Sequence, residues 1–261
     1  METEPRAITT RSIEYLRHEA SMRGDNYMRW VEKPKGSKIP LWTKLEAGAW
    51  RGQRCFVIGG GTSLADFDFD RLGRSGERVI VCNRGFVEAP FADIMIAMDI
   101  DLYNWIEARE IGRTHEEQVA ITKAFHKFKG LRVWIDMNNS TMNAPVHYVL
   151  RESRPVIHKK LKNGIFCGNN IGVGALCLAA TLGASPIYLL GYDFYLQKGA
   201  KGQIKKTHFH SGYPRKMVDS HVKSFVGFFG MIAPAIRRRG IRVYNMNRKS
   251  KLRIFPFADF K

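Results

Sequence analysis

The chain has 261 residues, of which 44% are hydrophobic, so it is long enough for one α/β domain with a real core. No apolar run reaches the ~18 residues that span a bilayer, and the first residues lack the apolar core of a secretion signal. We therefore expect no stable membrane insertion and a cytoplasmic location.

The net charge is +18 and is unevenly distributed along the chain. Residues 151–261 carry 21 Lys and Arg against 4 Asp and Glu, and residues 1–150 carry 21 Lys and Arg against 20 Asp and Glu. A cationic half attracts polyanions such as nucleic acid, anionic lipid or phosphorylated glycan, although many basic proteins bind nothing specific through charge.

The chain begins with a segment, residues 1–50, that we interpret as an N-terminal helical extension. Residues 11–23 have helical spacing, and residues 31–42 contain two prolines, which favours a loop. Strand patterns follow at 55–60, 78–83, 92–99, 131–137, 185–193 and 241–247. Helical patterns lie at 102–112, 169–183 and 219–240. Apolar strands that alternate with helices predict one α/β domain over residues 51–261, with a mostly parallel sheet and helices on both faces.

Cysteines give no sign of a disulfide framework or a zinc site. The chain has four cysteines, Cys55, Cys82, Cys167 and Cys177. None is part of a CxxC pair, and three of the four lie in apolar runs. We expect reduced, buried cysteines.

The first candidate site is the Gly-rich turn after the first strand of the domain, Gly59, Gly60 and Gly61 followed by Thr62 and Ser63. Such a turn exposes backbone N–H groups at the start of a helix, where phosphate binds well. The turn matches neither the P-loop nor the full GxGxxG pattern. A tight structural turn, with Thr62 or Ser63 as a helix cap, is the alternative.

Polar residues follow three other apolar segments. Asn83 ends the second strand, where it offers a donor and an acceptor to a base or ribose. Gly168, Asn169 and Asn170 open an apolar helix and allow a ligand to approach its start, although packing alone would also explain the glycines. Asp99 and Asp101 follow the third strand, where paired carboxylates either bind a metal or cap a helix.

Two further groups complete the candidate site. Asp193 and Tyr195 end the very apolar strand over residues 185–193, where they are placed for substrate. Three histidines, His208, His210 and His221, lie in the basic half, and histidine is the commonest general base near neutral pH. A capping or surface role for His221 stays open, and the HxH spacing of His208 and His210 is a weak metal-chelating pattern with no nearby cysteine and few carboxylates.

Residues 197–214 form a long, basic, Gly-rich segment that we interpret as a mobile lid. Aromatic residues are interleaved with basic ones in and after this segment, a composition that suits a nucleic-acid backbone. The candidate nucleic-acid-binding residues are Lys198, Lys201, Lys205, Lys206, Arg215 and Lys216.

The order of these motifs resembles that of the small bacterial sialyltransferases that decorate lipooligosaccharide, and of the related 6-hydroxymethylpterin diphosphokinase-like family. The resemblance covers about residues 54–257 and implies a Rossmann-like domain. In the sialyltransferases an Asn-Gly-Pro-Ser turn holds the nucleotide, and residues 60–63 occupy that position, with Gly60 in place of Asn and Thr62 in place of Pro. This difference means that CMP-sialic acid is not implied as the donor.

Other family motifs match in part. The Cys-Asn end of the second strand corresponds to residues 82–83, and the Thr-Ser-Gly helix start corresponds weakly to residues 169–172. Gly-Ile-Asp-Phe-Tyr matches residues 191–195 closely, and its Tyr, here Tyr195, is a site residue in the family. The family's general-base histidine precedes the helix before the last strand, where His221 fits best.

We therefore expect a nucleotide-sugar-dependent glycosyltransferase without a metal requirement. His221 would take a proton from the acceptor hydroxyl, Tyr195 would contact the leaving phosphate, and Asp193 would lie near the sugar. The basic half favours a DNA acceptor, such as the hydroxymethylated bases of some viruses, which would place the protein in a host cytoplasm. The alternatives are a lipooligosaccharide glycosyltransferase, an ATP- and Mg²⁺-dependent diphosphokinase using Asp99, Asp101 and Asp193, and a non-catalytic nucleic-acid-binding module.

Overall fold

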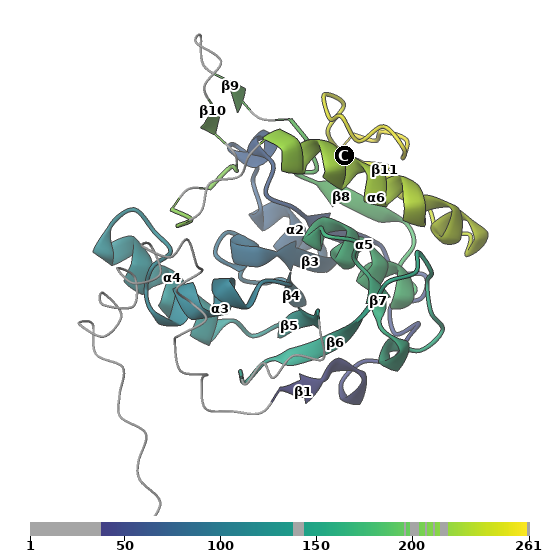
Figure 1. Cartoon of the computed structure of the whole chain (residues 1–261), viewed down its shortest axis with the longest axis horizontal. Helices are drawn as coiled ribbons and strands as arrows, with labels where there is room; N and C mark the ends of the chain where they lie inside the picture. The colour runs from purple at the N-terminus through teal and green to yellow at the C-terminus, as the bar shows by residue number, and fades with distance from the viewer. Residues whose placement is uncertain are drawn as a thin grey trace, which may run out of the picture.

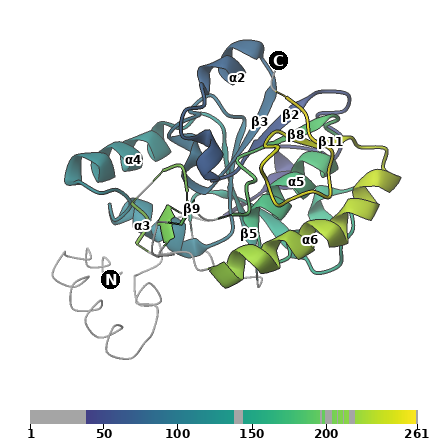
Figure 2. The ribbon, with the colours of Figure 1, turned by 90° about the horizontal axis from the view of Figure 1, so that it is seen from above.

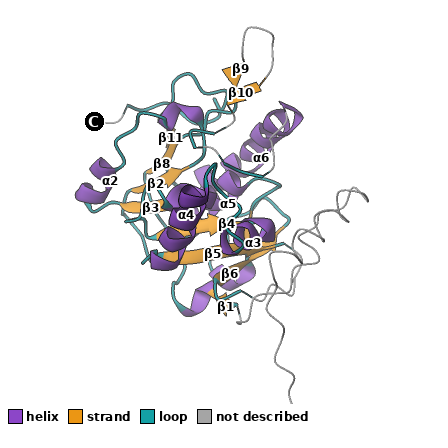
Figure 3. Cartoon of the chain, turned by 90° about the vertical axis from the view of Figure 1, so that its left-hand side faces the viewer, coloured by secondary structure: helices purple, strands orange, loops and turns teal. Residues whose placement is uncertain are grey.

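A parallel sheet forms the centre of the computed structural model, which describes residues 38–137, 144–195, 197–198, 204–206, 208–210, 212–214 and 219–259. Nine strands of the described part belong to it, and every pair is parallel. In spatial order they are β1 (Ile39–Pro40), β6 (His147–Glu152), β5 (Leu131–Asp136), β4 (Ile94–Ala97), β3 (Arg78–Cys82), β2 (Cys55–Ile58), β8 (Ile187–Leu190) and β11 (Val243–Asn245), with β7 (Ile165–Phe166) beside β6. Figure 3 shows this order from β11 to β1.

Helices cover both faces of the sheet, as Figures 1 and 2 show. On one face lie α2 (Asp70–Ser75), α3 (Ile100–Glu107) and α4 (His115–Lys127), which share one buried cluster with the sheet. On the other face lie α5 (Ile171–Thr181) and α6 (Asp219–Arg238), which share the second cluster. β2 and β4 are buried along their whole length, because a parallel sheet between two helical layers has no solvent-facing side.

The fold class predicted from the sequence, a Rossmann-like α/β domain, is confirmed. All six predicted strands are present as β2, β3, β4, β5, β8 and β11, and the three predicted helices are α3, α5 and α6. Strands β1, β6 and β7 and helices α2 and α4 were not predicted from the sequence.

The predicted helix at residues 11–23 lies outside the described residues, so the extension over residues 1–50 stays a prediction. The described end of that segment contacts the domain. Strand β1 pairs with β6 at the edge of the sheet, and the Leu41 and Trp50 side chains are buried in the core. Residues 38–50 therefore pack as part of the same hydrophobic unit as the sheet.

The predicted lid contains a small two-stranded antiparallel sheet, which stands out from the body of the domain in Figure 1. Its strands are β9 (Gln197–Lys198) and β10 (Ile204–Lys206). The backbones of Lys198, Lys205 and Lys206 therefore lie on this ribbon, whereas Lys201, Arg215 and Lys216 lie outside the described residues.

Two observations bear on the expectations from composition. All four cysteines are buried and unpaired, and burial raises the pKa of the Cys82 thiol to about 12. None of the helices in the described ranges is long and apolar enough to cross a membrane.

Candidate functional site

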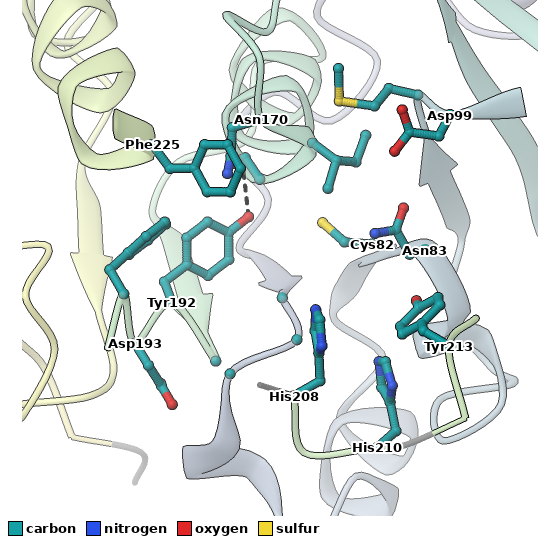
Figure 4. A pocket seen from close by; sticks show the side chains of 18 of the residues that line it. Cys82, Asn83, Asp99, Asn170, Tyr192, Asp193, His208, His210, Tyr213 and Phe225 are labelled. Carbon is teal, nitrogen blue, oxygen red and sulfur yellow. Dashed lines mark hydrogen bonds between the residues drawn. The ribbon is translucent and has the colours of Figure 1, made fainter. Parts of the chain in front are cut away.

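The candidate site lies where the direction of strand order reverses. β2 is hydrogen-bonded to β3 on one side and to β8 on the other, and the next strands lie in opposite directions across the sheet, with β3 following β2 and β11 following β8. In open α/β sheets, ligands bind in the crevice outside the carboxyl ends of the strands at such a switch point. A cavity of about 230 Å³ lies in this crevice. Figure 4 shows the cavity and its lining.

The Gly-rich turn forms one wall of the cavity with Gly59, Gly60 and Gly61. Two of these glycines are required by close packing. A Cβ on Gly59 would lie 2.9 Å from the Gly191 carbonyl oxygen, and one on Gly61 would lie 2.5 Å from both that oxygen and the Asp193 Cγ. At Gly60 the nearest atom is instead the Cδ2 of His208, at 2.6 Å, so this glycine leaves room for a side chain of the cavity wall.

Asp193 fixes the shape of this turn. It is 3% exposed, and its carboxylate accepts hydrogen bonds from the Ser63 backbone N–H at 2.8 Å and the Ser63 hydroxyl at 2.6 Å. The Asn247 side-chain amide donates at 2.8 Å, and the Thr62 hydroxyl adds a longer contact of 3.4 Å. Asp193 thus joins the turn after β2, the loop after β8 and the turn after β11.

These contacts change the interpretation of three predicted site residues. Thr62 and Ser63, predicted to bind the ligand, direct their hydroxyls to Asp193, and neither is among the described residues that line the cavity. Asp193, predicted to be catalytic, does line the cavity, but its oxygens are occupied by donors of the protein. Its geometry is that of a positioning residue.

Replacing Asp193 with Ala is expected to lower the free energy of unfolding by about 3 kcal/mol, because the buried carboxylate accepts several part-buried hydrogen bonds, and its donors on Ser63 and Asn247 would lose their acceptor. Urea unfolding of the variant measures this loss. Asp68→Ala is the matched control, since the Asp68 side chain is 56% exposed and its removal should change stability by less than about 0.5 kcal/mol. Equal losses in both variants would show that Asp193 does not hold the turn.

Two asparagines provide polar groups on the remaining walls. Asn83 follows β3 in the left-handed conformation, with φ 52°, which Asn adopts more readily than most residues. Asn170 lines the cavity and caps α5, since its side-chain oxygen accepts from the Val173 N–H at 3.1 Å. Asn169 lines the cavity as well, as predicted for this helix start.

Gly168 and Asp101, in contrast, lie away from the cavity wall. Gly168 has φ 56° and lies against α6, because a Cβ there would be 2.4 Å from the Phe228 ring. Asp101 is buried in the first turn of α3, while its neighbour Asp99 lines the cavity. In the described part of the chain no three His, Cys, Asp or Glu side chains come close enough together to hold a metal ion.

Aromatic residues after β8 form the apolar side of the cavity. Tyr192 lines the cavity, and its hydroxyl donates to the Gly172 carbonyl at 3.0 Å, which ties this wall to the start of α5. Phe194 lines the cavity with φ 52°, a strained conformation for a bulky residue. Tyr195, predicted from the sequence, also lines the cavity, and so does Phe225 of α6, which is labelled in Figure 4.

Two histidines complete the wall opposite Asn170. The His208 and His210 rings are stacked with centroids 5.3 Å apart and planes 9° apart, and Tyr213 packs against both. From the sequence, these two were interpreted as competitors of His221 for the role of base and as a weak metal-binding pattern. The structure brings both to the cavity, whereas His221 is the third residue of α6 and its side chain lies outside the described residues.

Burial and a buried cation act together on His208. Loss of water around the ring, and then the nearby charge of Arg84, lower the His208 pKa from 6.5 to about 4. Arg84 is itself buried and lies 3.6 Å from Glu88 and 3.7 Å from Glu117. His208 is therefore neutral at physiological pH.

This shift predicts a pH-dependent loss of stability. The unfolded chain takes up a proton at His208 below pH 6.5 and the folded chain only below about pH 4. The free energy of unfolding should therefore fall by up to about 3 kcal/mol between these values, with no contribution from His208 above pH 6.5. His208→Gln cannot titrate, so urea unfolding of this variant at pH 7 and 4.5 should show a smaller loss than the native chain. An equal fall in the free energy of unfolding in both proteins would show that the His208 ring is hydrated and that its pKa is not lowered.

Comparisons of the chain with protein-family models, with curated proteins and with solved structures give no match.

Proposed function

We propose that this cavity binds a nucleotide-linked sugar and that the protein transfers the sugar to a hydroxyl of a polyanionic acceptor. The observation that supports the proposal most is the position of the Gly-rich turn, at the switch point of the sheet and on the wall of the cavity. Gly60 brings backbone close to the ligand space without a side chain. The N–H groups of Gly59 and Gly61 donate to the Leu190 and Gly191 carbonyls, so the backbone N–H of Gly60 is the donor that the proposal assigns to a phosphate.

The rest of the lining suits the other parts of such a donor. Asn83 and Asn170 offer amide groups to a ribose or base, and Phe225 and Tyr195 offer aromatic surface. The volume of about 230 Å³ is below the roughly 300–1,000 Å³ of pockets for whole drug-sized ligands. The cavity thus fits a portion of the donor molecule. The rest of the donor would extend from the open side of the cavity, next to the lid.

The chemistry that fits is a single displacement at the anomeric carbon. The acceptor hydroxyl gives its proton to a histidine base as its oxygen bonds to the anomeric carbon. The bond from that carbon to the donor phosphate breaks, and the nucleotide leaves with the electron pair. Of the histidines described on the cavity wall, His210 fits this role better, because a base works best with a pKa near the operating pH and the His208 pKa is far below it. The assignment of the base to His221 stays a prediction.

The proposed acceptor is DNA, since the basic half of the chain carries a net charge of +17. A phosphorylated glycan is the rival acceptor. Asp193 argues against an ATP-dependent diphosphokinase that holds Mg²⁺ there, because its oxygens already accept hydrogen bonds from Ser63 and Asn247.

A thermal-shift screen of nucleotides and nucleotide-sugars tests the proposal. A ligand present at about 100 times its Kd stabilises the folded state by about 2.7 kcal/mol, which is readily detected. We expect nucleotide-sugars of one base to raise Tm without added metal. A rise with ATP only in the presence of Mg²⁺ would favour the diphosphokinase, and no shift with any nucleotide would contradict the proposal.

A further inference from the structure

A second, larger cavity of about 710 Å³ lies on the face of the sheet formed by β2 and β8. It runs between α2 and the C-terminal segment that follows β11. Phe56 and Tyr188 form its floor, and four arginines surround it: Arg54, Arg71, Arg74 and Arg248. We refer to this cavity as the arginine groove.

The floor of the arginine groove belongs to a row of aromatic rings across three strands. Phe56, Tyr188 and Tyr244 are register neighbours on β2, β8 and β11. Their rings are stacked, with centroids 5.0 Å apart in the first pair and 5.6 Å in the second. Tyr188 is partly exposed, so the row presents an aromatic edge and a phenol to the groove.

The arginines at the rim carry more charge than the acids beside them. The lining includes four arginines and two carboxylates, Glu77 and Asp259, and a third carboxylate, Asp68, pairs with Arg74. The Arg54, Arg74 and Arg248 side chains are 57%, 68% and 63% exposed although each is paired with a carboxylate. Exposed pairs of this kind contribute little to stability, so a phosphate group can replace the carboxylate at low cost.

The arginine groove also reaches the candidate site. Met246 and Arg248 line the groove, and Asn247 between them donates to the Asp193 carboxylate at 2.8 Å. Asp193 lines the first cavity. One turn after β11 therefore lines the groove and contacts a residue on the wall of the first cavity.

We propose that the arginine groove binds a single-stranded nucleic acid and guides it, as the acceptor, toward the first cavity. Phosphates would lie on the arginines, and unpaired bases would contact the exposed edge and hydroxyl of Tyr188 on the floor. A duplex keeps its bases stacked inside and offers mainly phosphates to a protein surface, so it would leave the floor unused. The acceptor role rests on the proposed transferase function, whereas the binding itself does not.

Fluorescence anisotropy with a labelled oligodeoxythymidine, measured without donor over a range of salt concentrations, tests the groove. Each phosphate contact contributes about −0.7 to the slope of log affinity against log salt for a single strand. Arg71→Ala with Arg74→Ala should therefore make the slope shallower by about 1.4. Tyr188→Leu should leave the slope unchanged and weaken binding by about tenfold, because base contacts with the exposed edge and hydroxyl of the ring are lost.

Arg154→Ala is the matched control. Its side chain is 72% exposed and paired with Glu152, like the groove arginines with their carboxylates, but it lies just beyond β6. It should change neither slope nor affinity. An equal effect of Arg154→Ala, tighter binding of duplex DNA that ignores Tyr188→Leu, or binding of a phosphorylated oligosaccharide in place of the oligonucleotide would overturn the proposal.

The two proposals fail in different ways. If a nucleotide-sugar raises Tm but the oligonucleotide does not bind, the transferase proposal stands and the groove proposal is wrong. If the oligonucleotide binds as expected and no nucleotide raises Tm, the groove stands and the transferase proposal is wrong.

Discussion

Gly60→Val is expected to abolish nucleotide binding while the protein stays folded. Gly60 does not have a positive φ, so the backbone tolerates a side chain, but its Cβ would lie 2.6 Å from the His208 Cδ2. The branched side chain would displace the histidine ring and fill the space where the proposed phosphate contacts the turn. We expect no nucleotide-induced rise in Tm for this variant, and a urea unfolding transition that remains cooperative.

Two other glycines show how specific this test is. A side chain at Gly61 would meet the Gly191 carbonyl and the Asp193 carboxyl, both at 2.5 Å, so substitutions there would damage the fold itself. At Gly227 in α6, a Cβ would have no atom of another described element within 4 Å, so Gly227→Val is a matched control that should bind nucleotide like the native chain. Native nucleotide affinity in folded Gly60→Val would remove the turn from the site.

His210→Gln is expected to slow sugar transfer by about 10²–10⁴-fold with little change in donor affinity, because a general base contributes about that factor. The His210 ring lies on the cavity wall, one stacked ring beyond His208 and beside Tyr213. Single-turnover rates and donor Kd values of the variant separate a catalytic loss from a binding loss.

The same substitution at His208 and at His221 identifies the base. His208→Gln should retain more activity than His210→Gln, because a neutral His208 with a pKa of about 4 is a poor proton acceptor at neutral pH. If His221→Gln loses sugar transfer completely while His210→Gln transfers at a near-native rate, the base is His221 on α6, as predicted from the sequence.

The elements predicted correctly are those with the simplest hydrophobic pattern. β2, β4 and β8 are continuous apolar runs that end in glycine or a polar residue, as buried parallel strands do. β6, His147–Glu152, was not predicted because it carries charged and partly exposed residues among its apolar ones, as fits its place near the edge of the sheet. α4 was missed because only three of its residues are buried.

For the site, the sequence predicts which strand ends meet, since parallel strands bring their carboxyl ends to one edge. Gly59, Asn83, Asn170 and Tyr195 line one cavity for this reason. Side-chain direction does not follow from that rule. Nothing in the residue pattern indicates that Ser63 donates to Asp193, 130 positions later, or that the pair His208 and His210 folds back against Gly60. The spacing HxH, interpreted as a weak metal signal, was the only local clue to that pair.

The contact between Asn247 and Asp193 has a consequence for synthesis of the chain. The turn at Gly59 leaves the ribosome early, but its neighbours on β8 and the donor on Asn247 are made much later. At translation rates of ~5–20 residues per second, roughly 10–40 s separate the emergence of Gly59 from that of Asn247. Until β8 is made, β2 has only β3 as a finished neighbour, and the Asn247 contact forms later still. The nascent turn has no assembled cavity around it, so we expect the proposed nucleotide to stabilise the completed chain and not to serve as a template during synthesis.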